Sequence, residues 1–419
     1  MPVSRRYFLK SGAVALAGVG SVAGGLPSFL VRAAASSGAR GKTLVVLFQR
    51  GAADGLNIVV PHGESRYYDL RPSIAIPRPA KGVSGTAIDL DGLFGLHPAL
   101  GPFKKMFDDG LLAIVNAAGS PDATRSHFDA QDFMETGTPG VKNTRDGWLN
   151  RYLQQYAPRR QTNFRAVSST AQMPRILGGR APALAIADLS KFGIPGRHAE
   201  VAQKGLQRLY AGAGDDLLTP TASETFEAVH ALSLLDYEAY RPANGASYSG
   251  RGLGKSLRQI AHLIKADVGL EIAFAEIGGW DHHVKEGGAE GQLSNLLRRF
   301  SGDVAAFVTD MGPRMDDVVV VTMSEFGRTA SENGSRGTDH GHANALFVMG
   351  GPVKGGKVYG DWPGLADDRL HEGRDLALTT DFRDVISELL QGHLGASRLE
   401  AVFPGYAIDA RRYRGLLGG

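Results

Sequence analysis

Acidic and histidine side chains recur beside strand-like apolar runs in this chain. The six that stand out are Asp54, Asp281, His283, Glu325, His340 and His342. The first four follow the runs KTLVVLFQRGAA, LEIAFAEIGGW and VVVVTMS. Because loops that leave the carboxyl ends of parallel strands gather at one edge of a sheet, side chains far apart in the sequence meet there. Mixed oxygen and imidazole ligands suit zinc, manganese or iron better than calcium. The pattern predicts a divalent metal site of one or two ions, with zinc or manganese favoured.

Each of these residues also has an ordinary structural interpretation. Asp54 could cap a helix or order a turn. Asp281 and His283 could lie in a surface turn, and Glu325 could form a buried ion pair with Arg328. The sequence alone leaves these alternatives open.

The segment GTDHGHAN places two imidazoles beside a carboxylate. An aspartate beside a metal-bound histidine often fixes which ring nitrogen carries the proton, and Asp339 stands in that position next to His340. For His342 and for His127, metal ligation and a supporting hydrogen bond are both open interpretations. The remaining histidines stand alone on ordinary segments and are expected to be surface or core residues.

The elements that must position these side chains are short apolar runs alternating with helical patterns. Strands are expected over residues 42–48, 111–117, 165–169, 270–277, 318–322 and 345–349. Helices are expected over residues 150–156, 223–240, 256–265 and 293–308. This alternation predicts an α/β fold with a mostly parallel central sheet and helices on both faces. The Pro- and Gly-rich residues 61–102 are expected to form a long loop insertion with a short hairpin.

The N-terminus predicts export. SRRYFLK precedes a charge-free stretch over residues 11–31, and three alanines at 33–35 offer a cleavage site. This is typical of a twin-arginine signal peptide, here residues 1–35, followed by a single domain over 36–419. A retained anchor is the alternative, because about 20 residues suffice to span a bilayer. We expect a periplasmic or secreted protein that engages the twin-arginine translocase and has no stable membrane anchor after cleavage.

Composition excludes several classes of protein. The chain has no cysteine, so it has neither disulfides nor a thiolate nucleophile. Four of its 46 Lys and Arg residues lie in residues 1–35, which leaves 42 against 43 Asp and Glu residues. A chain so nearly neutral gives no electrostatic reason to expect nucleic acid as a partner.

Several motifs together resemble a known family. RGAADGLNIVVP, SHFDAQDFMETG, GGWDHH, SEFGRT, GTDHGHAN and GGPVKGGKVYGDWPGL resemble the exported family known as domain of unknown function 1501. That family is in turn similar to the alkaline phosphatase and sulfatase superfamily, whose members bind two metal ions. The resemblance implies an alkaline-phosphatase-like fold in which Asp54 is the first ligand. It also implies one metal site formed by Asp281, His283 and His340, with Glu325 a ligand of the other.

The chain departs from the superfamily pattern at specific positions. Phe326 stands where a ligating histidine is expected, so a single-metal site is a real alternative. His282 is an additional imidazole. Ser126 is the preferred nucleophile, with Thr124 behind it, and Arg328 is expected to hold phosphoryl oxygens. No sulfatase-type Cys-x-Pro-x-Arg or Ser-x-Pro-x-Arg motif is present.

These features predict an exported metal-dependent hydrolase of phosphate esters, with sulfate esters less favoured. A metal-activated serine or water would attack a small phosphorylated or envelope-associated substrate. Trp148, Trp280 and Trp362 are expected to line the entrance of the site. The alternative is a non-catalytic exported binding protein that keeps a degraded phosphatase-like site.

Overall fold

The computed structural model describes residues 41–159, 162, 164–191, 237 and 239–418. The expected signal peptide at residues 1–35 and nearly all of the helix expected over 223–240 lie outside these residues. All six expected strands lie within them and are present.

The core of the molecule is a nine-stranded sheet in the order β11-β5-β10-β9-β1-β8-β6-β7, with β12 also paired to β5. Its strands are β1 (Thr43–Arg50), β5 (Leu112–Gly119), β6 (Ala166–Ser168), β7 (Leu184–Ala185), β8 (Ile272–Gly278), β9 (Val318–Ser324), β10 (Asn344–Gly350), β11 (Lys357–Tyr359) and β12 (Thr380–Asp381). Strand β1 runs parallel to both neighbours, β8 and β9. Strand β10 runs antiparallel to both β9 and β5. The sheet is therefore mostly parallel, as predicted.

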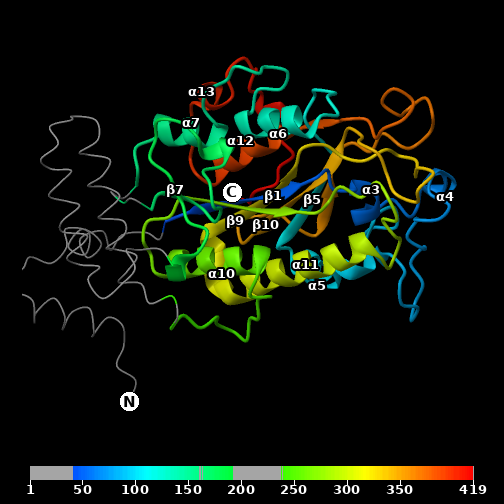
Figure 1. Ribbon diagram of the computed structural model, residues 1–419, viewed down its shortest axis with the longest axis horizontal. Helices are drawn as coiled ribbons and strands as arrows, with labels where there is room; N and C mark the ends of the chain where they lie inside the picture. The colour runs from blue at the N-terminus through cyan, green and yellow to red at the C-terminus, as the bar shows by residue number, and fades with distance from the viewer. Residues whose placement is uncertain (1–40, 160–161, 163, 192–236, 238, 419) are drawn as a thin grey trace, which may run out of the picture.

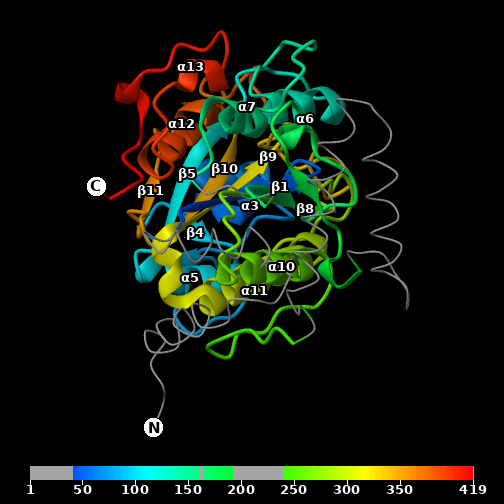
Figure 2. The ribbon, with the colours of Figure 1, turned by 90° about the vertical axis from the view of Figure 1, so that its left-hand side faces the viewer.

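Helices cover both faces of the sheet, as Figures 1 and 2 show. One layer contains α5 (Gly101–Asp108), α10 (Gly252–Lys265) and α11 (Gln292–Met311). The opposite layer contains α6 (His127–Thr136), α7 (Trp148–Gln155), α12 (Phe382–Gly392) and α13 (Leu399–Val402). Successive side chains of a strand point to opposite faces, so Val45 packs in the first layer's core and Val46 in the second's. The predicted α/β class is confirmed.

The segment over residues 61–102 is more structured than the expected loop. It contains α4 (Ser65–Leu70) and the antiparallel pair β3 (Ile88–Asp89) and β4 (Gly95–Leu96), which confirms the expected short hairpin. Strand β4 also pairs with β2 (Val59–Val60), which follows α3 (Gly55–Ile58). Figure 1 shows α3 and α4 together at one end of the molecule. This end is where β1 finishes.

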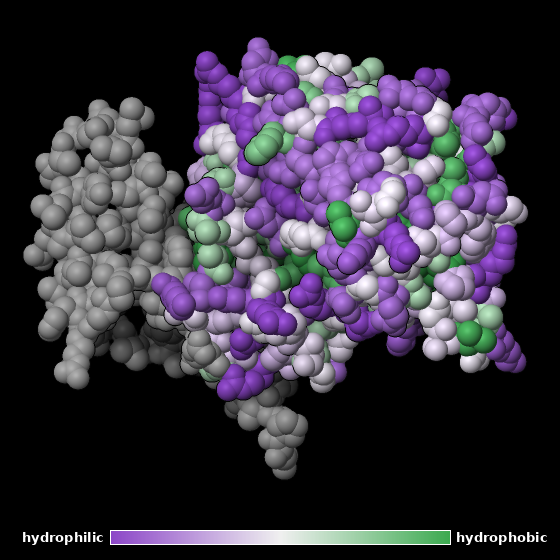
Figure 3. Space-filling view, turned by 45° about the vertical axis from the view of Figure 1, so that its right-hand side comes forward, coloured by the Kyte–Doolittle hydropathy of each residue, from purple (hydrophilic) through white to green (hydrophobic). Residues whose placement is uncertain are grey.

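The remaining elements are 3₁₀ turns: η1 (Pro98–Leu100), η2 (Arg175–Leu177), η3 (Leu189–Lys191), η4 (Gly312–Asp317) and η5 (Ala410–Arg412). The face in Figure 3 is mainly hydrophilic, with small scattered apolar patches. Among the described residues, no helix has the length and apolar character needed to cross a membrane.

Candidate metal centre

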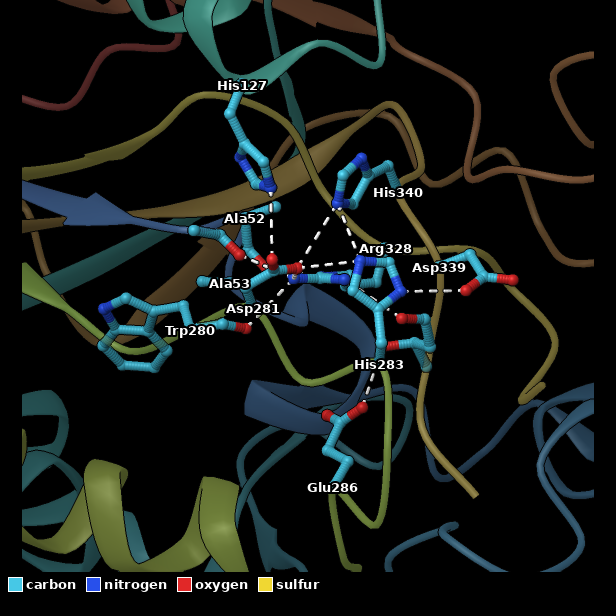
Figure 4. A network of polar contacts seen from close by, with 12 residues as sticks. Ala52, Ala53, His127, Trp280, Asp281, His283, Glu286, Arg328, Asp339 and His340 are labelled. Atoms are coloured by element: carbon cyan, nitrogen blue, oxygen red, sulfur yellow. Dashed lines mark hydrogen bonds and ion pairs between the residues drawn. The ribbon is translucent and has the colours of Figure 1, made fainter. Parts of the chain in front are cut away.

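The candidate site lies where loops from several strands meet. Asp281 comes three residues after β8, and Glu325 comes directly after β9. His340 precedes β10 by four residues, and His127 is the first residue of α6, which follows β5. Figure 4 shows His127, Asp281, His283 and His340 facing one another. Sheet topology therefore brings together side chains separated by more than 200 positions.

Three of these residues form a group with metal-ligand geometry. One ligand atom from each of His127, Asp281 and His340 lies within 4.8 Å of the other two. Nε2 of His340 is 3.3 Å from Oδ1 of Asp281, and Nε2 of His127 is 3.6 Å from Oδ2. Within the described ranges, this is the one group of three or more acidic and histidine side chains whose ligand atoms lie close enough together to share an ion.

His283 borders the same group. Its Nε2 lies 3.0 Å from Oδ1 of Asp281 and 2.9 Å from Nε2 of His340. Two imidazole nitrogens at that distance repel if both carry lone pairs, and a proton or a cation between them removes the repulsion.

The other nitrogen of each ring is held by an acceptor. The three contacts join Nδ1 of His127 to Oε1 of Glu325 at 2.9 Å, Nδ1 of His283 to Oδ1 of Asp339 at 2.9 Å, and Nδ1 of His340 to the carbonyl oxygen of Arg125 at 2.8 Å. A neutral imidazole that donates from Nδ1 has its lone pair on Nε2. In addition, Nε2 of His127 is buried without a hydrogen-bond partner. These donors fit a divalent metal, whose histidine ligands usually donate from the second nitrogen.

The electrostatics of the site favour the ligand-competent forms of Asp281, Glu325 and His340, whereas the hydrogen bond to Glu325 raises the pKa of His127. Burial alone would raise the pKa of Asp281, but the hydrogen bond and charge of Arg328 lower that pKa below its usual value. Burial likewise works to raise the pKa of Glu325, and hydrogen bonds from His127 and Gln131 lower it overall. Burial lowers the pKa of His340. At neutral pH both carboxylates are ionised and His340 is neutral.

Arg328 is buried at 2% exposure and braces the loops around Asp281. Its Nε donates to the carbonyl of Ala52 at 2.7 Å, and its Nη2 donates to the carbonyl of Gly51 at 2.6 Å and to Oδ1 of Asp281 at 2.5 Å. Its Nη1 donates to the carbonyl of Thr338 at 3.0 Å. Arg328 thus pairs with Asp281 and not, as the alternative interpretation held, with Glu325.

Glu325 lies behind His127. Its Oε1 accepts from the backbone N–H of Gly51 at 2.8 Å and from Nε2 of Gln131 at 2.9 Å, in addition to His127. Its Oε2 accepts from the hydroxyl of Ser324 at 3.1 Å. The structure therefore places this carboxylate as the acceptor that orients an imidazole.

Asp54 lies apart from the group of three. It is 2% exposed, and Arg71 binds both of its oxygens, through Nη1 at 2.5 Å and Nη2 at 2.9 Å. Burial acts to raise the pKa of Asp54, but the charge and hydrogen bonds of Arg71 lower it overall. Asp54 is thus an ionised carboxylate with an internal counter-ion.

His342 and Ser126 also have other partners. The buried ring of His342 stacks on His371 with ring centroids 4.3 Å apart, and burial lowers the pKa of His342 to about 4. Ser126 caps helix α6, where its hydroxyl accepts from the N–H of Asp129 at 3.4 Å. Ser126 nonetheless lies between Arg125 and His127, whose atoms contact the site.

The sequence of the chain matches a protein-family model. The family model described as "Protein of unknown function (DUF1501)" matches residues 113–402. The chain belongs to the DUF1501 family. No curated protein matches the sequence of this DUF1501 protein.

Three solved structures are similar to the DUF1501 chain at low identity. The zinc complex of the C-terminal periplasmic domain of EcEptC from Escherichia coli has a TM-score of 0.36 and 11% identity, covering 75% of this chain and 74% of that one. The PsFucS1 sulfatase from Pseudoalteromonas sp. has a TM-score of 0.35 and 13% identity, covering 87% and 70%. The PH0037 protein from Pyrococcus horikoshii has a TM-score of 0.28 and 11% identity, covering 74% and 86%. All three TM-scores are below 0.5.

Two of the three tryptophans are not at the entrance of the site in this DUF1501 protein. Trp148 and Trp280 are fully buried in the two cores beside the sheet. Figure 4 shows the indole of Trp280 turned away from the imidazoles. The expectation that both line an entrance is wrong, because their apolar rings complete the helix layers. Trp362 packs edge-on against Phe94, with ring centroids 5.1 Å apart.

Sequence reasoning missed Arg71 and Gln131. Arg71 lies in the segment over residues 61–102, where no periodic pattern marked an element. Gln131 lies one turn along α6 from His127, and this spacing is the signal that would have placed both side chains on one helix face.

Proposed function

We propose that this protein is an exported, metal-dependent hydrolase of phosphate esters, with sulfate esters as less favoured substrates. One observation carries the proposal: ligand atoms of His127, Asp281 and His340 converge within 4.8 Å, while Nδ1 of each of these two imidazoles is held by an acceptor. Nε2 of His127 is buried without a hydrogen-bond partner and lies 3.6 Å from Oδ2 of Asp281, so its lone pair is available to a metal ion.

The charges around the imidazoles favour a cation. Asp281, Glu325 and Asp339 contact the three rings, Arg328 contacts Asp281, and Arg374 donates to the carbonyl of His340. Carboxylates therefore outnumber guanidiniums around the site. Imidazole nitrogens with one carboxylate oxygen form a ligand set that zinc accepts and that also suits manganese.

In this proposal, the metal ion and the side chains have different roles in catalysis. When bound, a divalent ion supplies Lewis-acid polarisation of the ester and lowers the pKa of an attacking hydroxyl. Arg328 holds the Asp281 carboxylate in place, and Glu325 orients the ring of His127. In this proposal Arg328 is a positioning residue. Ser126 remains the proposed nucleophile, because it directly precedes His127 at the start of α6. A water molecule is the alternative nucleophile.

A second candidate is a non-catalytic exported binding protein. The observation that favours it is the state of Arg328, whose three nitrogens all donate to carbonyls or to Asp281. That guanidinium leaves little capacity to hold substrate oxygens. Such a protein would bind metal and an anionic ligand without turnover.

Export is part of the proposal and is tested separately. The twin-arginine motif predicts passage through the twin-arginine translocase into the periplasm, where a small phosphorylated or envelope-associated substrate would be met. Replacing Arg5 and Arg6 with lysine should retain the chain in the cytoplasm, measured by immunoblot of cell fractions. Arg32→Lys, outside the motif, should be exported normally. Equal export of both variants would contradict this route.

The activity is tested with full-length protein purified without chelators. Elemental analysis should find bound zinc or manganese, and a panel of aryl phosphates should be hydrolysed faster than the matching aryl sulfates. Asp281→Asn should abolish metal binding and turnover, whereas Asp367→Asn, an exposed aspartate paired with Arg66, should change neither. Ser126→Ala separates the nucleophiles, because only a serine mechanism requires that hydroxyl.

The outcomes distinguish the candidates. Metal with turnover supports the hydrolase. Metal without turnover on any ester supports the binding protein, and the absence of both metal and turnover would overturn the proposal.

A further inference from the structure

We infer that the site holds a single divalent ion and that the guanidinium of Arg71 takes the place of a second cation at Asp54. This inference rests on the proposed function and narrows it, since the superfamily resemblance implied two ions. The evidence for it is that the residues expected to form a second metal site already have other partners.

The first of these residues, Asp54, has no free oxygen. Arg71 binds it in a two-pronged ion pair in which the side chains are 2% and 0% exposed. Arg71 is itself fixed, because its Nε donates to the carbonyl of Ala330 at 2.9 Å and its Nη2 to that of Thr329 at 2.8 Å. A metal ion could reach Asp54 only by displacing this guanidinium, which would leave a buried charge unpaired.

The charges beside Asp54 are already matched. Glu286 is fully buried against Asp54 and accepts from the hydroxyl of Thr338 at 2.8 Å. Burial, and next the neighbouring charge of Asp54, raise the pKa of Glu286 well above its usual value. With Glu286 neutral, one carboxylate faces one guanidinium, and no negative charge remains for a cation.

Glu325 and Phe326 do not complete a second site either. Both Glu325 oxygens accept hydrogen bonds, from Gly51, His127 and Gln131 on one side and from Ser324 on the other. The ring of Phe326 lies 5.0 Å from the rings of both His127 and His340. An apolar ring therefore occupies the position where a second metal site would need a further ligand.

The other group of side chains still favours a cation. Around the three imidazoles, the carboxylates of Asp281, Glu325 and Asp339 outnumber the guanidiniums of Arg328 and Arg374, so negative charge remains for an ion there. The two neighbouring sets thus use different counter-ions: a guanidinium built into the chain at Asp54, and an exchangeable metal at Asp281.

The test is the metal stoichiometry of the full-length protein. Protein stripped with EDTA is reloaded with excess zinc, freed of unbound metal and analysed by mass spectrometry. The wild type should hold one equivalent. Asp281→Asn should hold none, and His340→Ala should lose the ion on washing. The double variant Asp54→Asn with Arg71→Gln removes both charges together and should still hold one equivalent, because His127, Asp281 and His340 are unchanged.

Manganese offers a second readout that needs no variant. One isolated Mn²⁺ per chain gives a six-line electron paramagnetic resonance spectrum, whereas two ions about 4 Å apart interact magnetically. The wild-type spectrum should show the isolated ion. This measurement decides the question even if the double variant does not fold.

The outcomes separate this inference from the proposed function. Two equivalents in the wild type, or loss of the ion in a folded Asp54→Asn, Arg71→Gln variant, would overturn the single-ion inference and leave the hydrolase proposal standing. No metal in the wild type would overturn both.

Discussion

Nδ1 of His127 lies 2.9 Å from Oε1 of Glu325, and this contact turns the opposite nitrogen of the ring towards Asp281, 3.6 Å away. Glu325 is itself held in place, being 1% exposed and bound by the N–H of Gly51. Glu325, which follows β9, thus affects the candidate metal site by orienting the ring of His127.

Neutralising Glu325 should weaken metal binding without removing a ligand. Glu325→Gln loses the charge that favours donation from Nδ1 of His127, and such supporting carboxylates are typically worth 10–100-fold in metal affinity. Zinc affinity measured by competition with a chromogenic chelator should fall by that factor. Glu400→Gln, which alters an exposed glutamate in the first turn of α13, is the control. Equal affinities would contradict the supporting role.

Asp375 is predicted to support His340 from behind. Its buried Oδ2 holds Nη2 of Arg125 at 2.7 Å, and the carbonyl of Arg125 accepts from His340. Nη2 of the adjacent Arg374 donates to the carbonyl of His340 at 3.0 Å. Asp375→Asn should therefore lower zinc affinity about tenfold, as other supporting contacts do.

Glu372 provides the control for Asp375. It binds the same Nη2 of Arg125 at 2.7 Å but is 55% exposed, so solvent competes for the contact. Glu372→Gln should leave zinc affinity within about twofold of wild type, as expected for an exposed ion pair. If both variants behave alike, burial of Asp375 is not what positions His340.

Gly337 should not tolerate a side chain. A Cβ there would lie 2.4 Å from the backbone carbon and oxygen of His283, which are not free to move as a flexible side chain would be. Gly337→Ala should displace the loop that carries His340 and reduce zinc affinity, while the fold measured by circular dichroism is retained. Gly334→Ala, where a Cβ meets nothing within 4 Å, should bind zinc normally. Wild-type affinity in Gly337→Ala would show that the two loops move together.

Acid should destabilise the protein through His97. Burial lowers the pKa of His97 to about 4, whereas an unfolded histidine has a pKa of about 6.5. The unfolded chain therefore binds more protons, so stability is complete above pH 6.5 and is lost as the pH falls towards 4. At pH 5, the free energy of unfolding should be about 2 kcal/mol lower than at neutral pH because of His97 alone.

The test compares metal-free wild type with His97→Asn at pH 7.5 and pH 5 by urea denaturation. In the wild type, the ring accepts from the N–H of Ala99 at 3.0 Å and its Nε2 contacts the carbonyl of Gly288 at 3.1 Å. Asparagine can still accept from Ala99 but does not titrate. The variant should lose less stability on acidification, by about the 2 kcal/mol of the histidine. Identical losses would exclude His97 as a source of the acid sensitivity.

The fold was predictable because its signals are local. The four valines at the start of β9 are β-branched and fully buried, which suits a strand covered on both faces. The antiparallel direction of β10 was not predictable from its own residues, because an apolar run has the same composition in either direction.

The site was predictable only to the level of its loops. Strand ends fix where Asp281, Glu325 and His340 leave the sheet, and this was enough to bring them together. Which side chain faces the ion and which supports it depends on hydrogen bonds of about 3 Å, and strand positions do not resolve that distance. Arg71 was missed for a related reason, since no local pattern tells that its guanidinium folds back onto Asp54.

The most direct test of the metal centre is anomalous X-ray diffraction from crystals of zinc-loaded protein, measured on both sides of the zinc absorption edge. We expect one peak bonded to Nε2 of His127 and His340 and to a carboxylate oxygen of Asp281, at distances of about 2.0–2.2 Å. A zinc peak bonded to Asp54 instead, or no peak among these three side chains, would contradict it.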